Sequence, residues 1–199
     1  MPRSASRHRL LMQTFLTVLT TAGLGLDYDT LRLQPTSQEW VDAGSRLRDR
    51  LADLLVNQVV GVEQIGSSSV VGLLAKPIVD IAVALAAEHD LQPVHERLVG
   101  AGWIYRGDAG ARGGHVYVLE TEQWHRVAHL HVVDQEGEQW SNYLRLRNLL
   151  RRDPSARARY EAVKQQLAGQ VADDRTAYTD GKTSIVHQLL QEADEASDT

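Results

Sequence analysis

Residues 65–80 of this chain, IGSSSVVGLLAKPIVD, join a polar turn to an apolar segment that contains a single acid. The run Ile78–Leu85 is rich in valine and isoleucine, which predicts a strand buried on both faces. The turn before it holds Gly66, Ser67 and Ser68, whose backbone amides and hydroxyls are suited to donate to a phosphate group. The stretch therefore predicts a phosphate-binding turn that leads into an acid-bearing strand.

Asp80 is the charged residue within that strand. An ionised carboxylate is costly to bury unless it binds a cation or accepts strong hydrogen bonds. Residues two apart on a strand share a face, so Asp80 is expected to lie beside Ala82 and Ala84. These small side chains leave space next to the carboxylate, which makes Asp80 a candidate functional group.

Outside this stretch the chain shows both helical and strand patterns. Apolar residues three and four apart between Trp40 and Leu55 predict an amphipathic helix. The turn that begins at Gly66, called the Gly-Ser turn below, is expected to begin a helix that reaches toward Gly72. Further strands are predicted at residues 59–65, 115–119 and 128–133. From Trp140 onward the pattern is helical, with a break at Asp153-Pro154. The expected fold class is α+β, a mixed β-sheet with helices packed on it and a C-terminal helical segment.

One domain, residues 31–192, is expected because a chain of 199 residues with 43% hydrophobic content builds one good core. Residues 193–199 are predicted to be a disordered tail. Residues 1–30 form a predicted N-terminal extension that carries no charge from Leu10 to Leu26. That stretch is a signal peptide, a helix or mobile extension of a cytoplasmic protein, or the result of a start misassigned ahead of Met12. Its polar threonines and lack of a small-x-small cleavage site favour the cytoplasmic interpretation without a membrane span.

Composition narrows the class of partner. The formal net charge of −5 argues against a protein that binds nucleic acid mainly through its charge, and favours a nucleotide or another small phosphorylated molecule as ligand. The chain has no cysteine, so any metal ion must be held by oxygen or imidazole ligands. The oligomeric state is not indicated by any pattern in the sequence.

The motif at residues 65–80 resembles the signature of the GrpB-like family, a branch of the nucleotidyltransferase superfamily also found fused to dephospho-CoA kinases. The resemblance continues downstream and covers about residues 30 to 190. It includes HLHVV at 129–133, YLRLRN at 143–148, Tyr160 with Lys164, and Tyr178 with Lys182. It implies a nucleotidyltransferase-like fold and an enzyme that uses a nucleoside triphosphate and a divalent metal on a small-molecule acceptor.

The chain departs from the family pattern at several positions. The family usually has His, Pro and Asp where this chain has Gln64, Val71 and Asn148. Active nucleotidyltransferases of the wider superfamily carry a second carboxylate two residues after the first, where this chain has Ala82. A single aspartate cannot hold and neutralise two metal ions. The departures therefore keep open an alternative, a catalytically degenerate module that binds a ligand or assists the folding of another protein.

His129 and His131 lie two apart on a predicted strand, so both project from one face. They are either polar residues of a half-exposed face or ligands for a metal or a phosphate. With Asp80 they form the predicted catalytic and metal-binding set. Magnesium or manganese is the expected ion from the resemblance, and zinc is an option because imidazole ligands suit it. The motif also resembles that of histidine-triad hydrolases, but Val133 stands at the position of their third histidine.

Phosphate-binding residues are predicted around the same turn, since cationic side chains neutralise phosphate oxygens. The set consists of Gly66, Ser67, Ser68, Lys76, Arg112, Arg147, Lys164 and Lys182. Lys164 is favoured among the cations because it shares a helical face with Tyr160, four residues earlier.

Overall fold

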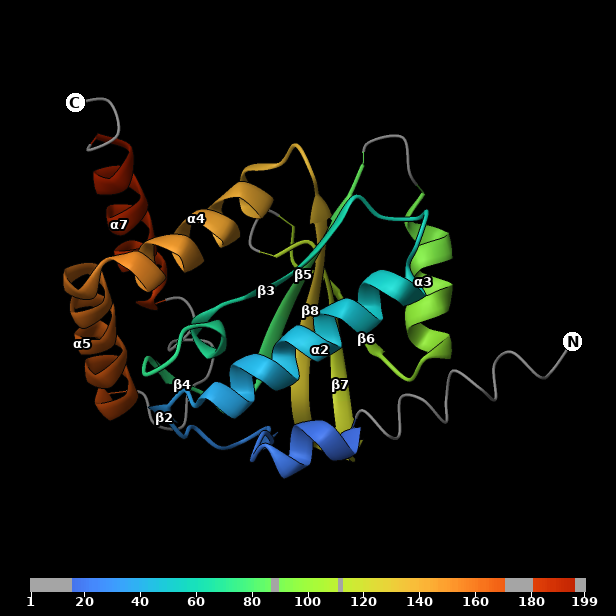
Figure 1. Ribbon diagram of the computed structural model, residues 1–199, viewed down its shortest axis with the longest axis horizontal. Coiled ribbons are helices and arrows are strands. Elements are labelled where there is room, and N and C mark those ends of the chain that lie inside the picture. Colours follow the sequence, from blue (N-terminus) through green and yellow to red (C-terminus); the bar gives the residue numbers. More distant parts are fainter. Residues whose placement is uncertain (1–15, 87–89, 111–112, 171–180, 196–199) are drawn as a thin grey trace, which may run out of the picture.

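The computed structural model describes residues 16–86, 90–110, 113–170 and 181–195, and it contains a six-stranded mixed sheet (Figure 1). The order across the sheet is β3-β5-β8-β7-β6, and β1 pairs with β8 beyond this path. The strands are β1 (Leu26–Asp27), β3 (Gly61–Ile65), β5 (Val79–Leu85), β6 (Ile104–Asp108), β7 (His115–Glu122) and β8 (His125–Asp134). β5 and β8 are parallel and the other pairs are antiparallel.

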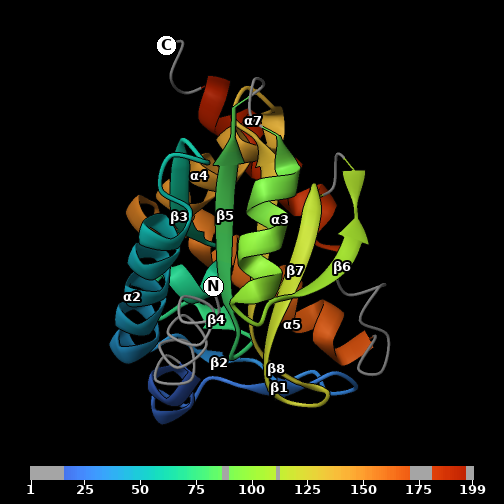
Figure 2. The same ribbon diagram turned by 90° about the vertical axis from the view of Figure 1, so that its right-hand side faces the viewer.

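Helices cover both faces of this sheet, which confirms the predicted α+β class (Figure 2). They are α2 (Gln38–Leu54), α3 (Leu91–Gly100), α4 (Glu138–Arg152), α5 (Pro154–Gln170) and α7 (Thr183–Glu195). α2 and α3 share one apolar core with β5 and β8, while α4, α5 and α7 form a second core with the segment that follows the Gly-Ser turn. A small sheet of β2 (Gln34–Pro35) and β4 (Leu74–Ala75) lies beside that turn.

The alternation of β5 decides which of its side chains meet each layer. Ile81 and Val83 belong to the core built with α2 and α3. Asp80, Ala82 and Ala84 project from the opposite face, as the strand pattern predicts. All residues of β5 except Asp80 are buried, so the prediction of a strand enclosed on both sides is confirmed.

α2 begins where Ser37 caps it, because the Ser37 hydroxyl accepts a hydrogen bond from the backbone N–H of Trp40. Its buried stripe consists of Trp40, Ala43, Leu47 and Leu51, with Gly44 among them. This helix packs on β3 and β5 and confirms the amphipathic pattern.

Gly44 allows α2 to approach β3 closely, and we expect Gly44→Ala to lower the free energy of unfolding by about 1–3 kcal/mol. An added Cβ would overlap the carboxamide of Gln64, which is 3% exposed and donates to the Ser68 carbonyl. This clash outweighs the higher helix propensity of alanine. Urea denaturation measures the change. Gly100→Ala is the matched control, because nothing lies within 4 Å of its added Cβ, and a similar loss there would contradict the packing argument.

Two local predictions differ from the structure. The helix expected from the Gly-Ser turn is a single 3-10 turn, η1 (Ser67–Ser69), because Gly72 adopts a φ of 82° and the chain then enters β4. The edge strand β6 was not among the strands predicted from the sequence. β6 is almost wholly exposed, so it lacks the apolar alternation by which a strand is recognised in sequence.

The described part of the predicted N-terminal extension packs into the protein. Residues 16–21 are helical, Leu19 and Leu24 are buried in the core shared with α2, and β1 pairs with β8. In the parts of the chain that the structure describes, none of the helices combines the length and apolar character needed to cross a membrane. At the other end α7 continues to Glu195, and residues 1–15 and 196–199 lie outside the described residues.

Candidate functional site

Asp80 and His129 meet because β5 and β8 are parallel neighbours whose register places these two residues directly opposite each other. Asp80 Oδ1 lies 3.2 Å from His129 Nδ1. The side chain of Asp80 is 31% exposed and that of His129 is 24% exposed, so the pair is accessible to a ligand. Two residues separated by 49 positions in the chain thus form one polar contact on the face of the sheet opposite α2 and α3.

The charge state of Asp80 fixes the direction of this hydrogen bond. Burial alone raises the pKa of Asp80, but the hydrogen bond and charge of His129, together with the charges of His131 and Lys182, outweigh it and hold that pKa below its ordinary value. An ionised carboxylate only accepts hydrogen bonds, so His129 donates through Nδ1–H. When the His129 ring is neutral, this arrangement leaves Nε2 free of hydrogen, as a proton acceptor.

His131 lies on the same face, opposite Ala82 in the register of β5 and β8. Its Nδ1 is 3.2 Å from the carbonyl oxygen of Gly113, and its ring centroid is 5.6 Å from that of Tyr143 on α4. Burial lowers the pKa of His131, although the charge of Asp80 opposes this. Because a carbonyl only accepts hydrogen bonds, Nδ1 of His131 also carries the hydrogen. These contacts from Gly113 and Tyr143 were not predicted from the sequence.

The Gly-Ser turn lies against Asp80, and this approach requires glycine at position 66. Gly66 has a φ of +69°, and a Cβ there would come within 2.7 Å of Asp80 Oδ2. The turn is braced by the Ser69 hydroxyl, which donates to the Gly66 carbonyl at 2.7 Å. Ser67 is partly exposed, whereas Ser68 and Ser69 are buried. Ser67 is therefore the serine of the turn whose side chain is open to a ligand.

Lys164 on α5 reaches across to this turn. Its Nζ lies 2.9 Å from Ser67 Oγ and also donates to the carbonyl of Leu74, and the residue is only 2% exposed. Burial is the main cause that lowers the pKa of Lys164 to about 7, and the charges of Lys182 and Lys76 add to it against the opposing charges of Glu161 and Asp80. The three predicted phosphate-binding lysines are therefore close enough for their charges to interact.

The remaining predicted phosphate ligands are placed differently. Arg147 donates to Glu63 Oε2 at 2.7 Å and to the Gln64 carbonyl at 2.9 Å, and these bonds tie α4 to β3. The Ser68 hydroxyl is buried and has no hydrogen-bond partner among the described residues. Arg112 lies outside the described residues. We use the term candidate site for Asp80, His129, His131, Ser67 and Lys164.

Of the predicted metal-binding set, Asp80 and His129 are in contact, and metal binding stays a prediction. Within the described ranges, no three histidine, aspartate or glutamate side chains gather in a way that would hold a metal ion. Ala82, beside Asp80 on the same face, offers no second carboxylate. The polar contacts of Asp80 and His129 instead match a pair that transfers protons.

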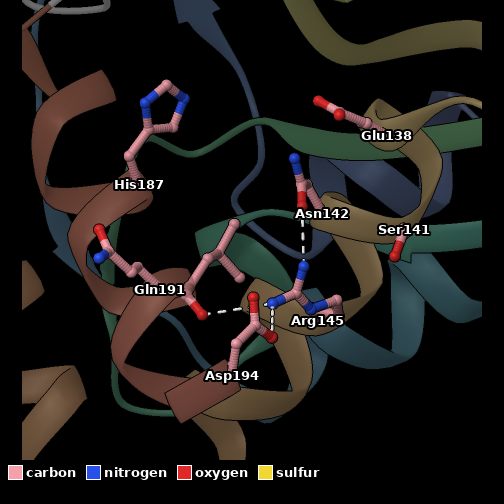
Figure 3. A pocket seen from close by; sticks show the side chains of 8 residues that line it. Glu138, Ser141, Asn142, Arg145, His187, Gln191 and Asp194 are labelled. Atoms are coloured by element: carbon pink, nitrogen blue, oxygen red, sulfur yellow. Dashed lines mark hydrogen bonds and ion pairs between the residues drawn. The ribbon is translucent and has the colours of Figure 1, made fainter.

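A surface hollow of about 390 Å³ lies elsewhere, between α4 and α7 (Figure 3). Arg145 lines it and contacts Asp194, the Leu190 carbonyl and Asn142. None of the predicted site residues lines this hollow. The hollow is therefore a surface feature of the C-terminal helices, separate from the candidate site.

Comparison with known proteins identifies the family. The model of the family described as "GrpB protein" matches residues 30–192. The chain belongs to the GrpB family. It is 29% identical over 172 residues to the glutamate-rich protein GrpB of Alkalihalophilus pseudofirmus, covering 85% of this chain and 99% of that protein. It is 34% identical over 164 residues to a UPF0157 protein of Deinococcus radiodurans, covering 82% of each.

Two solved structures have folds similar to that of this GrpB-family chain. The crystal structure of the conserved protein GrpB from Enterococcus faecalis superposes with a TM-score of 0.67 at 26% identity, over 81% of this chain and 99% of that one. The Cid1 poly(U) polymerase superposes with a TM-score of 0.50 at 14% identity, over 87% of this chain and 54% of that one. The second likeness concerns the fold alone, and it confirms the predicted nucleotidyltransferase-like architecture.

Proposed function

We propose that this GrpB-family protein binds a nucleoside triphosphate at the candidate site and transfers its nucleotidyl group to a small acceptor. The observation that carries the proposal is the hydrogen bond between Asp80 and His129, set beside a Gly-Ser turn with three lysines nearby. Lysines near a glycine turn suit phosphate oxygens, and an Asp–His pair suits removal of a proton from an acceptor hydroxyl. The nucleotidyltransferase-like fold supports this class of ligand.

In the proposed reaction each residue has a defined task. Lys76 and Lys182 neutralise the phosphates beside Ser67 and the turn amides. His129 accepts the acceptor proton at Nε2, and Asp80 orients the ring and stabilises the imidazolium that forms. The sequence predicts a divalent ion, which is magnesium, manganese or zinc. The described residues do not bring three donors together for it, so the ion is assigned no role here and is varied in the binding assay.

The second candidate function is a binding module that retains the fold without turnover. Ala82 favours it, because the carboxylate pair of active nucleotidyltransferases is incomplete in this chain. The two functions differ in one observable. An enzyme releases pyrophosphate from a bound nucleoside triphosphate, whereas a binding module retains the ligand intact.

Binding of the nucleotide is tested by isothermal titration with ATP, in EDTA and then with Mg²⁺, Mn²⁺ or Zn²⁺. We expect the double variant Lys76→Gln/Lys182→Gln to weaken binding by at least about tenfold, because it removes two charges that act on the phosphates. The matched control Arg46→Gln/Arg48→Gln removes two charges from α2, on the far side of the sheet, and should bind as wild type does. No heat with wild type, or equal losses in both double variants, would refute the proposed site.

A further inference from the structure

Lys164 has an environment that an ordinary phosphate-binding lysine lacks. Its Nζ contacts two neutral oxygens, the Ser67 hydroxyl and the Leu74 carbonyl, and the residue is 2% exposed. Neither of these partners is a carboxylate. Lys76 and Lys182 are only partly buried and are better placed to meet a phosphate arriving from solvent. The buried position of Lys164 therefore calls for a different role.

The same contact allows proton transfer. A protonated lysine donates to the Ser67 oxygen, but a neutral amine has a lone pair that accepts the proton of the serine hydroxyl. Burial and the charge of Lys182 bring the pKa of Lys164 to about 7, so the neutral amine is well populated near neutral pH. A serine hydroxyl whose proton has a base within hydrogen-bond distance is an activated nucleophile.

We propose that Ser67 is a covalent nucleophile with Lys164 as its general base, so that nucleotidyl transfer proceeds by double displacement. Ser67 Oγ attacks the α-phosphorus of the nucleoside triphosphate and forms an O–P bond. The bond from the α-phosphorus to the bridging oxygen breaks, and pyrophosphate leaves with that electron pair. Lys164 Nζ takes the hydroxyl proton. This inference rests on the proposed function, because it requires the nucleotide to bind at the turn.

The second displacement uses the other half of the candidate site. The acceptor hydroxyl, deprotonated by His129, attacks the α-phosphorus and breaks its bond to Ser67 Oγ, and Lys164 returns its proton to the serine. Gly66 brings the turn that holds Ser67 against Asp80, and Asp80 contacts His129. Two bases at one site are explained if each serves one displacement.

Exposure also favours Ser67 over its neighbours as the nucleophile. Ser68 is 1% exposed and Ser69 is 2% exposed, and the Ser69 hydroxyl already donates to the Gly66 carbonyl. Ser67 is partly exposed and its hydroxyl contacts Lys164. The turn thus contains three serines, but the structure equips Ser67 with both access and a base.

The test is mass spectrometry of the intact protein and of its peptides. The protein is first incubated with ATP and Mg²⁺ without an acceptor, and the reaction is quenched with acid. We expect an adduct of one nucleoside monophosphate on the peptide that contains Ser67, and none in Ser67→Ala. Ser141→Ala, in the separate hollow on α4, should be labelled as wild type is. Lys164→Arg retains the positive charge but cannot act as a base near neutral pH, so it should bind ATP within about twofold and be labelled about 100-fold more slowly.

The outcomes separate this inference from the proposed function. Bound ATP without an adduct on Ser67 overturns the double displacement and leaves the proposed function standing. Absence of ATP binding by titration overturns both. Labelling of Lys164→Arg at the wild-type rate, or an adduct of phosphate alone, also overturns the inference, because the first excludes the base and the second excludes attack at the α-phosphorus.

Discussion

Lys164→Met is expected to remove a rise in stability with pH that the wild-type protein shows above neutrality. In the unfolded chain Lys164 has its ordinary pKa of 10.5, whereas in the folded protein burial lowers its pKa to about 7. Between these values the unfolded state binds more protons than the folded state, so the free energy of unfolding increases with pH. The increase approaches about 1.4 kcal/mol per pH unit and totals about 5 kcal/mol.

The sign of this effect distinguishes Lys164 from an ion-paired residue. Below pH 7 both states carry the proton, and the folded protein bears the full penalty of a buried charge. As pH rises through about 7 the folded state loses that charge, and the free-energy cost of removing the proton then falls until pH 10.5. Urea denaturation of wild type and Lys164→Met at pH 6, 7, 8 and 9 measures the difference in slope. Arg48→Met, on α2, controls for loss of a surface charge, and parallel curves for wild type and Lys164→Met would contradict a buried neutral amine.

The two strands that carry the central pair of the candidate site could be predicted from the sequence. β5 is one short apolar run with an acid in it, and β8 carries two histidines two residues apart, so both strands and their polar faces follow from a period of two. That Asp80 and His129 are direct neighbours does not follow, because register depends on parallel pairing across 49 residues of chain. Strand patterns predict faces, and tertiary packing decides which residues meet.

Other parts of the site depend on contacts that no local pattern records. Arg147 was expected at phosphate because it is cationic, but Glu63 lies within 2.7 Å of it on β3, and an ion pair satisfies both groups. Lys164 and Ser67 are 97 residues apart, and their contact depends on how α5 packs against the turn. His131 donates to the backbone carbonyl of Gly113. Every residue has such a carbonyl, so the residue type at position 113 gave no signal.

Asp80→Asn is expected to leave the fold intact and to lower the rate of nucleotidyl transfer by about 10³- to 10⁴-fold, provided that His129 is the base. Asparagine has the shape of aspartate, but it carries no charge and its amide nitrogen can donate to His129 Nδ1. The hydrogen of the imidazole then moves to Nε2, and the nitrogen that should accept the acceptor proton is blocked. Loss of the carboxylate also removes the charge that stabilises the imidazolium.

Two measurements give this prediction a clear outcome. Pyrophosphate release from ATP measures the rate, and ¹⁵N chemical shifts of the His129 ring report which nitrogen carries the hydrogen. We expect the hydrogen on Nδ1 in wild type and on Nε2 in Asp80→Asn, with ATP affinity changed by no more than about threefold, because the lysines that meet the phosphates are untouched. His129→Gln should lose as much rate as Asp80→Asn, and the double variant should lose little more, since the two side chains act as one unit. Losses that multiply in the double variant would show that Asp80 and His129 act separately, and would remove the Asp–His pair from the mechanism.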